Sequence, residues 1–223
     1  MTWSPTEELS ADRCALVLFD VLHAYLHPSD PERVRVLAQR DLIGNLGRLL
    51  GAARGHDMTV VYTLARHAPD SADVVSHPTD TDMDLHPWPD GVAIPFRPSV
   101  KRDDPNARIA DELAADANDL VLAKQRWSGF FQTPLELNLR ARGIDTIILA
   151  GMSTDVGIAS TAFSARDQDF GIVVARDACW SHRPGNHDFF MDRVFPRMAR
   201  VRSTEQVVSS ITERARARQD AAG

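Results

Sequence analysis

The chain has 223 residues, of which 43% are hydrophobic and 25% charged, and its formal net charge is −6. This length can bury one substantial core, and the ordinary composition excludes a disordered or fibrous protein. The acidic balance argues against nucleic-acid binding, which needs a basic face, and no apolar run approaches the roughly 20 residues of a membrane helix.

Short apolar runs recur along the chain and predict strands that are buried on both faces. In chain order these runs are Cys14–Asp20, Met58–Leu64, Asp119–Ala123, Thr146–Gly151 and Gly171–Ala175, with Ala199–Ser203 as a weaker edge strand. Segments with helical periodicity lie between them. The alternation predicts a three-layer α/β/α fold with a central parallel sheet of five or six strands and right-handed crossovers. We expect one domain over residues 1–223, with flexible ends at 1–12 and 213–223.

Two of the predicted helices carry clear end signals. The first covers about Pro31–Arg54, and Ser29 with Glu32 forms a capping box at its start. The second begins at a Thr133 cap and ends at Gly143, where a left-handed residue terminates helices. The sequence therefore predicts where both helices begin or end.

Three further helices are predicted from periodicity alone. One covers Val156–Arg166 and would turn Phe163 inward, together with Ala159 and Ala162. The other two cover Asn186–Met198 and Thr204–Arg216. The remaining long stretch, from Ala68 to Pro105, is rich in Pro, Asp and His and cannot be a regular element. Its length indicates a functional lid or a mobile insertion; we favour a lid, because Trp88 and Phe96 give it apolar side chains to bury.

Reactive side chains stand at the predicted carboxyl ends of the strands, where ligands bind in an open parallel sheet. Asp20 ends the first strand, Lys124 follows the third, and a tight turn, Gly151–Gly157, follows the fourth. A terminal Asp can simply cap a turn, and a terminal Lys can be a solvated charge. The convergence of an acid, a lysine and a turn nevertheless predicts a site. The other polar or aromatic residues at these ends are Arg66, His67, Arg126, Trp127 and Asp177.

The sequence resembles the isochorismatase-like, or cysteine hydrolase, superfamily over most of its length. "LVLFDVLHAYLHP" is similar to the first strand of that family and places its functional aspartate at Asp20. "DLVLAKQRWSGFFQTPLELNLRARGIDTIILAG" carries the family lysine at Lys124. "GMSTDVGIASTAFSARDQDF" is similar to the turn and helix that carry the nucleophile. The resemblance implies a hydrolase with the family's Rossmann-like fold.

The amidase members of this superfamily carry a cysteine nucleophile where this chain has Gly157. The resemblance is therefore to the members that lack it, the isochorismatases and their phenazine-pathway relatives, which hydrolyse a vinyl ether. It implies that Asp20 is the general acid, that Lys124 is the electrostatic anchor, and that the glycine makes room for the substrate ring. We interpret Cys14 and Cys179 as core residues.

A serine or threonine nucleophile is not favoured by the sequence. Ser153, Thr154 and Ser160 stand near the turn, but no histidine is evidently placed to activate them. The sequence leaves open whether Asp20 is protonated, as the acid mechanism requires. The ammonium of Lys124 would lower the pKa of Asp20 while burial would raise it, and a general acid must be protonated near the working pH. If Asp20 is the acid, the rate falls as pH rises.

Several residues are candidate substrate contacts. Asp155, Val156 and Gly157 would offer backbone N–H groups and the helix dipole to an anionic substrate, while Arg66, Trp127 and Phe131 would line the pocket. Isochorismatases usually carry Gln two positions after the aspartate, where this chain has Leu22. Either the substrate differs from isochorismate, or His23 or Tyr25 supplies that contact; His23 is equally interpretable as a surface histidine.

The sequence predicts no metal site and no cofactor, because metal-ligand spacings and glycine-rich nucleotide motifs are lacking. We expect a small-molecule substrate, no nucleic-acid or membrane partner, and a homodimer or higher homo-oligomer. The polar N-terminal residues predict no signal peptide and hence a cytoplasmic location. Two alternatives stay open. One is a diverged family member that catalyses another hydrolysis, elimination or hydration in a biosynthetic pathway, and the other is a non-catalytic small-molecule-binding protein.

Overall fold

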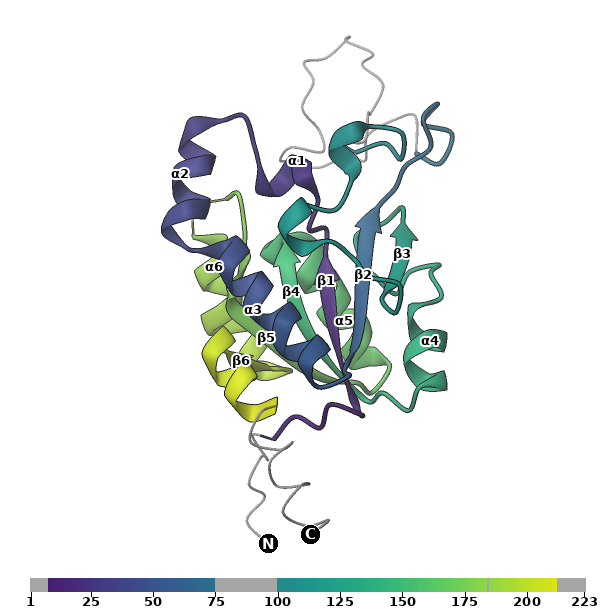
Figure 1. The fold of residues 1–223 in the computed structure, drawn as a ribbon, viewed down its shortest axis with the longest axis vertical. Helices are drawn as coiled ribbons and strands as arrows, with labels where there is room; N and C mark the ends of the chain where they lie inside the picture. Colours follow the sequence, from purple (N-terminus) through teal and green to yellow (C-terminus); the bar gives the residue numbers. More distant parts are fainter. Residues whose placement is uncertain (1–7, 75–99, 184, 212–223) are drawn as a thin grey trace, which may run out of the picture.

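The computed structural model describes residues 8–74, 100–183 and 185–211. Its strands form one sheet of six in the order β3-β2-β1-β4-β5-β6 (Figure 1), and every pairing is parallel. The strands are β1 Cys14–Phe19, β2 Thr59–Ala65, β3 Leu120–Lys124, β4 Thr146–Met152, β5 Gly171–Trp180 and β6 Arg200–Arg202. The predicted α/β/α architecture is confirmed, and the weak edge strand forms as β6.

The order of the strands reverses direction between β1 and β4. The chain proceeds outward from β1 through β2 to β3, then returns to β4 beside β1 and proceeds outward again through β5 to β6. Crevices that bind ligands form at such a reversal, beyond the carboxyl ends of the strands. The residues that follow β1 and β4 therefore stand where the fold itself provides a site.

Helices cover both faces of the sheet (Figure 1). On one face lie α3 (Leu42–Gly55) and the helical residues 204–211. Their apolar side chains form the first core cluster, into which Leu16 and Leu18 of β1 point. On the other face lie α4 (Leu135–Ala141) and α5 (Ala159–Asp167). Their apolar side chains form the second core cluster, into which Val17 and Phe19 point. Successive residues of β1 thus face opposite layers, as a strand's period of two requires.

Short helical pieces complete the described chain. They are α1 His23–Leu26, α2 Pro31–Gln39, the 3₁₀ turns η1 Pro105–Ala107 and η2 Asp111–Leu113, the π-helix η3 Thr154–Ile158, α6 Asn186–Phe189, the π-helix η4 Phe190–Val194 and the 3₁₀ turn η5 Phe195–Arg197. The helix predicted over residues 186–198 is therefore a succession of α, π and 3₁₀ turns. Of the helix predicted over 204–216, residues 212–216 lie outside the described residues.

The predicted helix Pro31–Arg54 is two helices. Asp41, with φ 48°, stands in the left-handed region between α2 and α3 and interrupts the helical hydrogen bonds. The N-cap of α2 is Asp30, whose carboxylate accepts the backbone N–H of Glu32 at 3.0 Å; Ser29, the predicted cap, stands one residue too early. Either residue type caps well, so composition alone did not separate them.

The end of α4 agrees with the sequence, whereas its N-cap is Pro134, one residue after the predicted Thr133. The hydroxyl oxygen of Thr133 accepts the backbone N–H of Leu135 at 3.2 Å, and Gly143 has a φ of 70° just after the helix. Two other predictions were wrong. The side of α5 that carries Phe163 faces outward, so that this residue is 50% exposed. Asp177 lies inside the longer β5, where its carboxylate accepts the backbone N–H and the hydroxyl of Thr204 at 2.7 and 2.8 Å.

Parts of two predictions lie outside the described residues. Residues 75–99 include Trp88 and Phe96, so the lid stays a prediction. The same holds for the flexible ends at residues 1–7 and 213–223, whereas Leu9 is buried in the first core cluster. Among the described helices, none combines the length and the apolar character needed to cross a bilayer.

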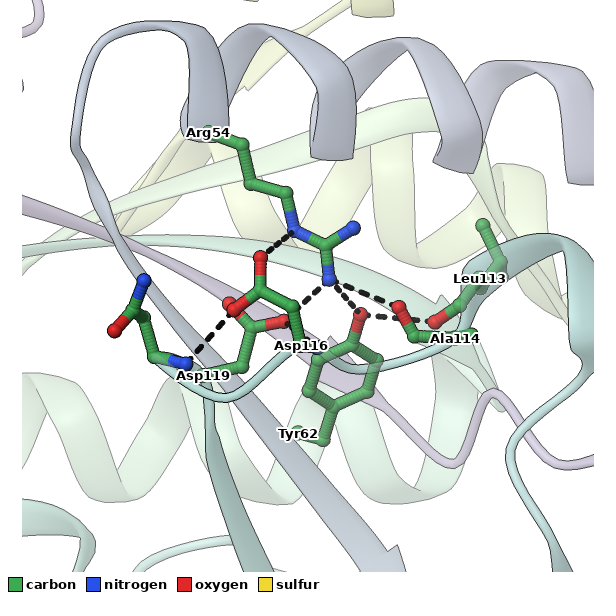
Figure 2. A network of polar contacts seen from close by, with 7 residues as sticks. Arg54, Tyr62, Leu113, Ala114, Asp116 and Asp119 are labelled. Atoms are coloured by element: carbon green, nitrogen blue, oxygen red, sulfur yellow. Dashed lines mark hydrogen bonds and ion pairs between the residues drawn. The ribbon is translucent and has the colours of Figure 1, made fainter.

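A partly buried polar cluster joins α3, β2 and the chain leading into β3 (Figure 2). The guanidinium of Arg54 donates to a carboxylate oxygen of Asp119 and to the carbonyl of Ala114, and its Nε lies 3.2 Å from an Asp116 oxygen. The hydroxyl of Tyr62 donates to the Leu113 carbonyl at 2.9 Å. Because Asp119 directly precedes β3, this cluster secures the amino end of an edge strand.

Candidate active site

Asp20 and Lys124 meet beyond the carboxyl ends of β1 and β3. Asp20 directly follows β1 with a left-handed backbone (φ 48°) and is 7% exposed. One of its carboxylate oxygens accepts the backbone N–H of Ala65 at 2.7 Å, and the other accepts the ammonium of Lys124 at 2.8 Å. Lys124 is the last residue of β3 and is 4% exposed. The two residues predicted to carry the chemistry are therefore in direct contact.

Burial is the largest influence on the pKa of Asp20. It raises the pKa of this carboxyl above its ordinary value, although the ammonium of Lys124, the N–H of Ala65 and the more distant Arg66 all act to lower it. The sequence had left the balance between burial and Lys124 open. The pKa is therefore shifted toward the neutral acid, which is the form that a proton donor needs.

The ring of Phe19 lies between Lys124 and the turn after β4. The Lys124 ammonium stands 4.3 Å from the centroid of this ring, which is buried. A Cβ atom built on Gly157 would lie 2.0 Å from Phe19 Cε1 and 2.5 Å from its Cζ. The space that we expected for a substrate ring on the side-chain side of Gly157 is thus filled by Phe19. A contact of the Gly157 backbone with substrate stays a prediction.

The turn after β4 packs closely against β1. Gly151, with φ 120°, pairs with Phe19, and a Cβ on Gly151 would lie 2.1 Å from the Phe19 carbonyl oxygen. Only glycine fits this approach. After the cis peptide bond Met152–Ser153, the chain enters η3. Gly151 therefore fixes how near the turn comes to the end of β1, where Asp20 stands.

Asp155 and Val156, predicted as substrate contacts, make bonds within the protein. The Asp155 carboxylate accepts the hydroxyl of Ser153 and the amide of Asn186, each at 2.5 Å. Burial acts to raise the pKa of Asp155, but these bonds and one from Ser181 hold it below its ordinary value. The N–H of Val156 donates to the Ser153 carbonyl at 3.3 Å. The Asp155 side chain thus braces the turn against α6.

A histidine does lie beside the turn, contrary to the expectation from sequence. Nδ1 of His187, in α6, is 2.9 Å from the hydroxyl oxygen of Thr154. His187 is 4% exposed, and Thr154 is fully buried. Burial lowers the pKa of His187 to about 4, so the ring is neutral at physiological pH. Since a nucleophile must reach its substrate, the buried Thr154 is a structural partner of His187.

Basic side chains surround the ends of β2 and β3. The N–H of Arg66 donates to the Lys124 carbonyl at 3.1 Å, and its guanidinium donates to the Ala107 carbonyl. Burial lowers the pKa of Arg66, while the nearby Asp20 raises it. Arg126 binds the Asp73 carbonyl at 3.1 Å, and His67 lies 3.6 Å from an Asp73 carboxylate oxygen. Arg66 is accordingly brought to the Asp20–Lys124 pair.

The other predicted substrate contacts are two exposed aromatic residues and two residues of α1. Trp127 and Phe131 are 55% and 52% exposed. His23 lies with Nδ1 3.0 Å from an Arg108 nitrogen, and Tyr25 packs against the first core cluster. Their contact with a substrate stays a prediction.

Both thiols are buried away from solvent. Cys14 opens β1 at the opposite end from Asp20, and Cys179 lies inside β5. Burial raises their pKa values to about 11 and about 12, so both are protonated, and hence weak nucleophiles, at neutral pH. Within the described ranges, no group of three or more His, Cys, Asp or Glu side chains is placed to hold a metal ion.

Comparison with known proteins gives a consistent result. The family described as "Isochorismatase domain" matches residues 14–206. The chain is 31% identical over 210 residues to the isochorismatase family protein YecD of Escherichia coli O157:H7, covering 92% of this chain and 99% of that protein. It is 30% identical over 176 residues to the maleamate amidohydrolase of Pseudomonas putida, covering 78% and 75% of the two chains.

A solved structure has the same fold. An isochorismatase family protein from Burkholderia thailandensis superposes with a TM-score of 0.74 at 26% identity, covering 92% of this chain and 98% of that one.

Proposed function

The chain belongs to the isochorismatase family, and from this premise we propose that it hydrolyses a small anionic metabolite of the vinyl-ether type without a cysteine nucleophile. The observation that carries the proposal is the buried Asp20, which contacts Lys124 and whose pKa is raised by burial. A vinyl ether is cleaved by protonation at carbon, so the protein must hold a proton, and a neutral carboxylic acid does so.

The steps balance with water as the only co-reactant. Asp20 transfers its proton to the terminal carbon of the enol ether, which leaves an oxocarbenium ion beside the newly formed carboxylate. Lys124 stabilises that carboxylate through their 2.8 Å contact. Water then adds to the cationic carbon and returns a proton to Asp20. The resulting hemiketal collapses to an alcohol and a ketone.

An anionic substrate is supported by the charges around the pair. Arg66 reaches the neighbourhood of Asp20, and Arg126 follows Lys124 by two residues. Lys101 pairs with His67 through the backbone, and its ammonium donates to the Pro69 carbonyl. A basic pocket concentrates anions and binds carboxylates through charge-assisted hydrogen bonds. Accordingly, a substrate carboxylate would sit near Arg66, with its reacting carbon toward Asp20.

A second candidate is an amide hydrolase, because the relative from Pseudomonas putida is named a maleamate amidohydrolase. That function requires a nucleophile, and the described thiols of Cys14 and Cys179 are buried with raised pKa values. A non-catalytic binding protein is the third possibility.

The homo-oligomer and the cytoplasmic location stay predictions; the oligomer is tested by light scattering of the purified protein.

The test is product formation from isochorismate, its 2-amino-4-deoxy analogue and maleamate. Each is incubated with the wild type, with the wild type treated with iodoacetamide, and with Asp20→Asn. Asp41→Asn is the matched control, since Asp41 has the same φ of 48°. We expect cleavage of a vinyl ether that withstands alkylation and is lost in Asp20→Asn. Maleamate cleavage that alkylation abolishes would establish the amide hydrolase, and binding without turnover would establish the third possibility.

A further inference from the structure

The Phe19 ring and a side chain at position 157 compete for one volume. An added Cβ on Gly157 would lie 2.0, 2.5 and 2.8 Å from the Cε1, Cζ and Cδ1 atoms of Phe19. Separations below 3.0 Å do not occur for real Cβ contacts, and these three atoms belong to a rigid ring. Phe19 is 1% exposed and packs within the second core cluster, so little free volume surrounds it.

A second contact fixes the ring from its other side. The ammonium of Lys124 stands over the ring face, 4.3 Å from the centroid, at a distance typical of a cation–π interaction. The same ring is therefore in contact with the catalytic lysine and with the turn that holds Gly157.

We propose that Phe19 is a specificity-determining residue that excludes any side chain, and with it a covalent nucleophile, at position 157. The exclusion is steric and reciprocal. With the ring present, residue 157 must be glycine; with the ring truncated, position 157 accepts a side chain that then faces Lys124. The inference deepens the proposed function and rests on it for its catalytic meaning, whereas the steric part holds whatever the substrate is.

A double-mutant cycle on stability tests the exclusion without any turnover. Gly157→Ala is made in the wild type and in Phe19→Val, which removes the ring atoms that meet the Cβ. In the wild type we expect the thermal midpoint to fall by roughly 5 °C or more, as overpacking of a core does in a chain of this size. In the Phe19→Val background the fall should shrink to about a third or less, since helical alanine is otherwise favoured over glycine.

Gly47→Ala is the matched control, because nothing lies within 4 Å of a Cβ at that helical position. Its effect should be equal in both backgrounds. Phe19→Leu, which keeps more of the core volume, provides a second background if Phe19→Val does not fold. An equal loss from Gly157→Ala with and without the ring would overturn the proposal.

Thiol reactivity tests the same volume chemically. In the Phe19→Val/Gly157→Cys double variant, the introduced thiol would face the Lys124 ammonium, which favours the thiolate. We expect one iodoacetamide equivalent to react at pH 7, at least about tenfold faster than any thiol of the wild type. Adding Lys124→Met should slow this reaction. A folded double variant whose new thiol reacts no faster than Cys14 and Cys179 would contradict the inference. Failure of the vinyl-ether assay would leave these results unchanged and count only against the proposed function.

Discussion

Two clusters of charged side chains stand at opposite ends of the same edge strand. Asp119, just before β3, pairs with Arg54, and Lys124, the last residue of β3, pairs with Asp20. Both clusters combine an acid with a base in contact. They differ in how burial and partners shift the pKa values, and this difference distinguishes a structural pair from the pair that we propose as catalytic.

In the Arg54 cluster the charged guanidinium is favoured. Burial acts to lower the pKa of Arg54, but its hydrogen bond to Asp119 and the nearby Asp116 raise it above the ordinary value. In the other cluster burial prevails, and the pKa of Asp20 is raised in spite of Lys124. The favoured charge on Arg54 suits a pair that secures the fold, whereas a carboxyl with a raised pKa suits the proton donor that we propose.

The largest effect on activity is expected from removing the acidic proton of the Asp20–Lys124 pair. Asp20→Asn should lower the turnover of a vinyl-ether substrate by about 10²–10⁴-fold, the usual contribution of a general acid, while near-UV circular dichroism stays that of the wild type. Asp41→Asn should leave turnover unchanged. Turnover of Asp20→Asn within a factor of about three of the wild type would remove Asp20 from the mechanism.

Removing the base of that pair should have a smaller effect with a distinct signature. Lys124→Met keeps the chain length but removes the ammonium that lowers the pKa of Asp20. We expect kcat to fall about 10²-fold, because the carboxylate formed during the reaction is no longer stabilised. The alkaline fall of the rate should move to higher pH, since Asp20 then keeps its proton longer. A shift to lower pH would contradict the assigned pair.

The Arg54 cluster should respond in stability instead of rate. Arg54→Met removes the cation from the Asp119 carboxylate, which is only 4% exposed and keeps the backbone N–H of Asp116. We expect a loss of about 1–3 kcal/mol in urea unfolding, with kcat unchanged. Arg35→Met, which breaks an exposed pair with Glu32 on α2, is the control and should leave the unfolding midpoint where it is. A change in kcat would show that the two clusters are coupled.

The smallest effect is expected at Tyr62. Tyr62→Phe removes the hydroxyl that donates to the Leu113 carbonyl at 2.9 Å and keeps the buried ring. One hydrogen bond is worth about 1 kcal/mol of unfolding free energy, so the urea midpoint should fall slightly, without any change in the pH–rate profile. A loss as large as that of Arg54→Met would indicate that the hydroxyl organises the whole cluster.

The sequence indicated the strands and the Asp20–Lys124 contact because both follow from local patterns. Apolar runs locate buried strands, and parallel strands bring their carboxyl ends to one edge. The split at Asp41 was missed because the apolar spacing continues across it, and only the left-handed backbone reveals it. Asp177 was misplaced because β5 continues past Ala175 to Trp180.

The contacts that distinguish this site depend on packing between distant segments. In the sequence, Phe19 is one more apolar residue of a buried strand. The residues next to it in the chain do not indicate that its ring lies against Gly157. The pairing of Thr154 with His187 joins residues 33 positions apart, and Arg54 and Asp119 are 65 apart. Single-sequence periodicity carries no information about such pairs, whereas the direction of the Asp20 pKa shift required knowing how deeply that carboxyl is buried.

The measurement that tests the account most directly is a pH titration of the side-chain carboxyl of Asp20 by ¹³C NMR. Protein labelled at aspartate is compared with Asp20→Asn to assign the resonance, and no substrate is needed. The account predicts one carboxyl, absent from the variant, that titrates above the ordinary aspartate value of about 3.9. A resonance of Asp20 that titrates at or below that value would show that Lys124 outweighs burial, and Asp20 would then not be the proton donor.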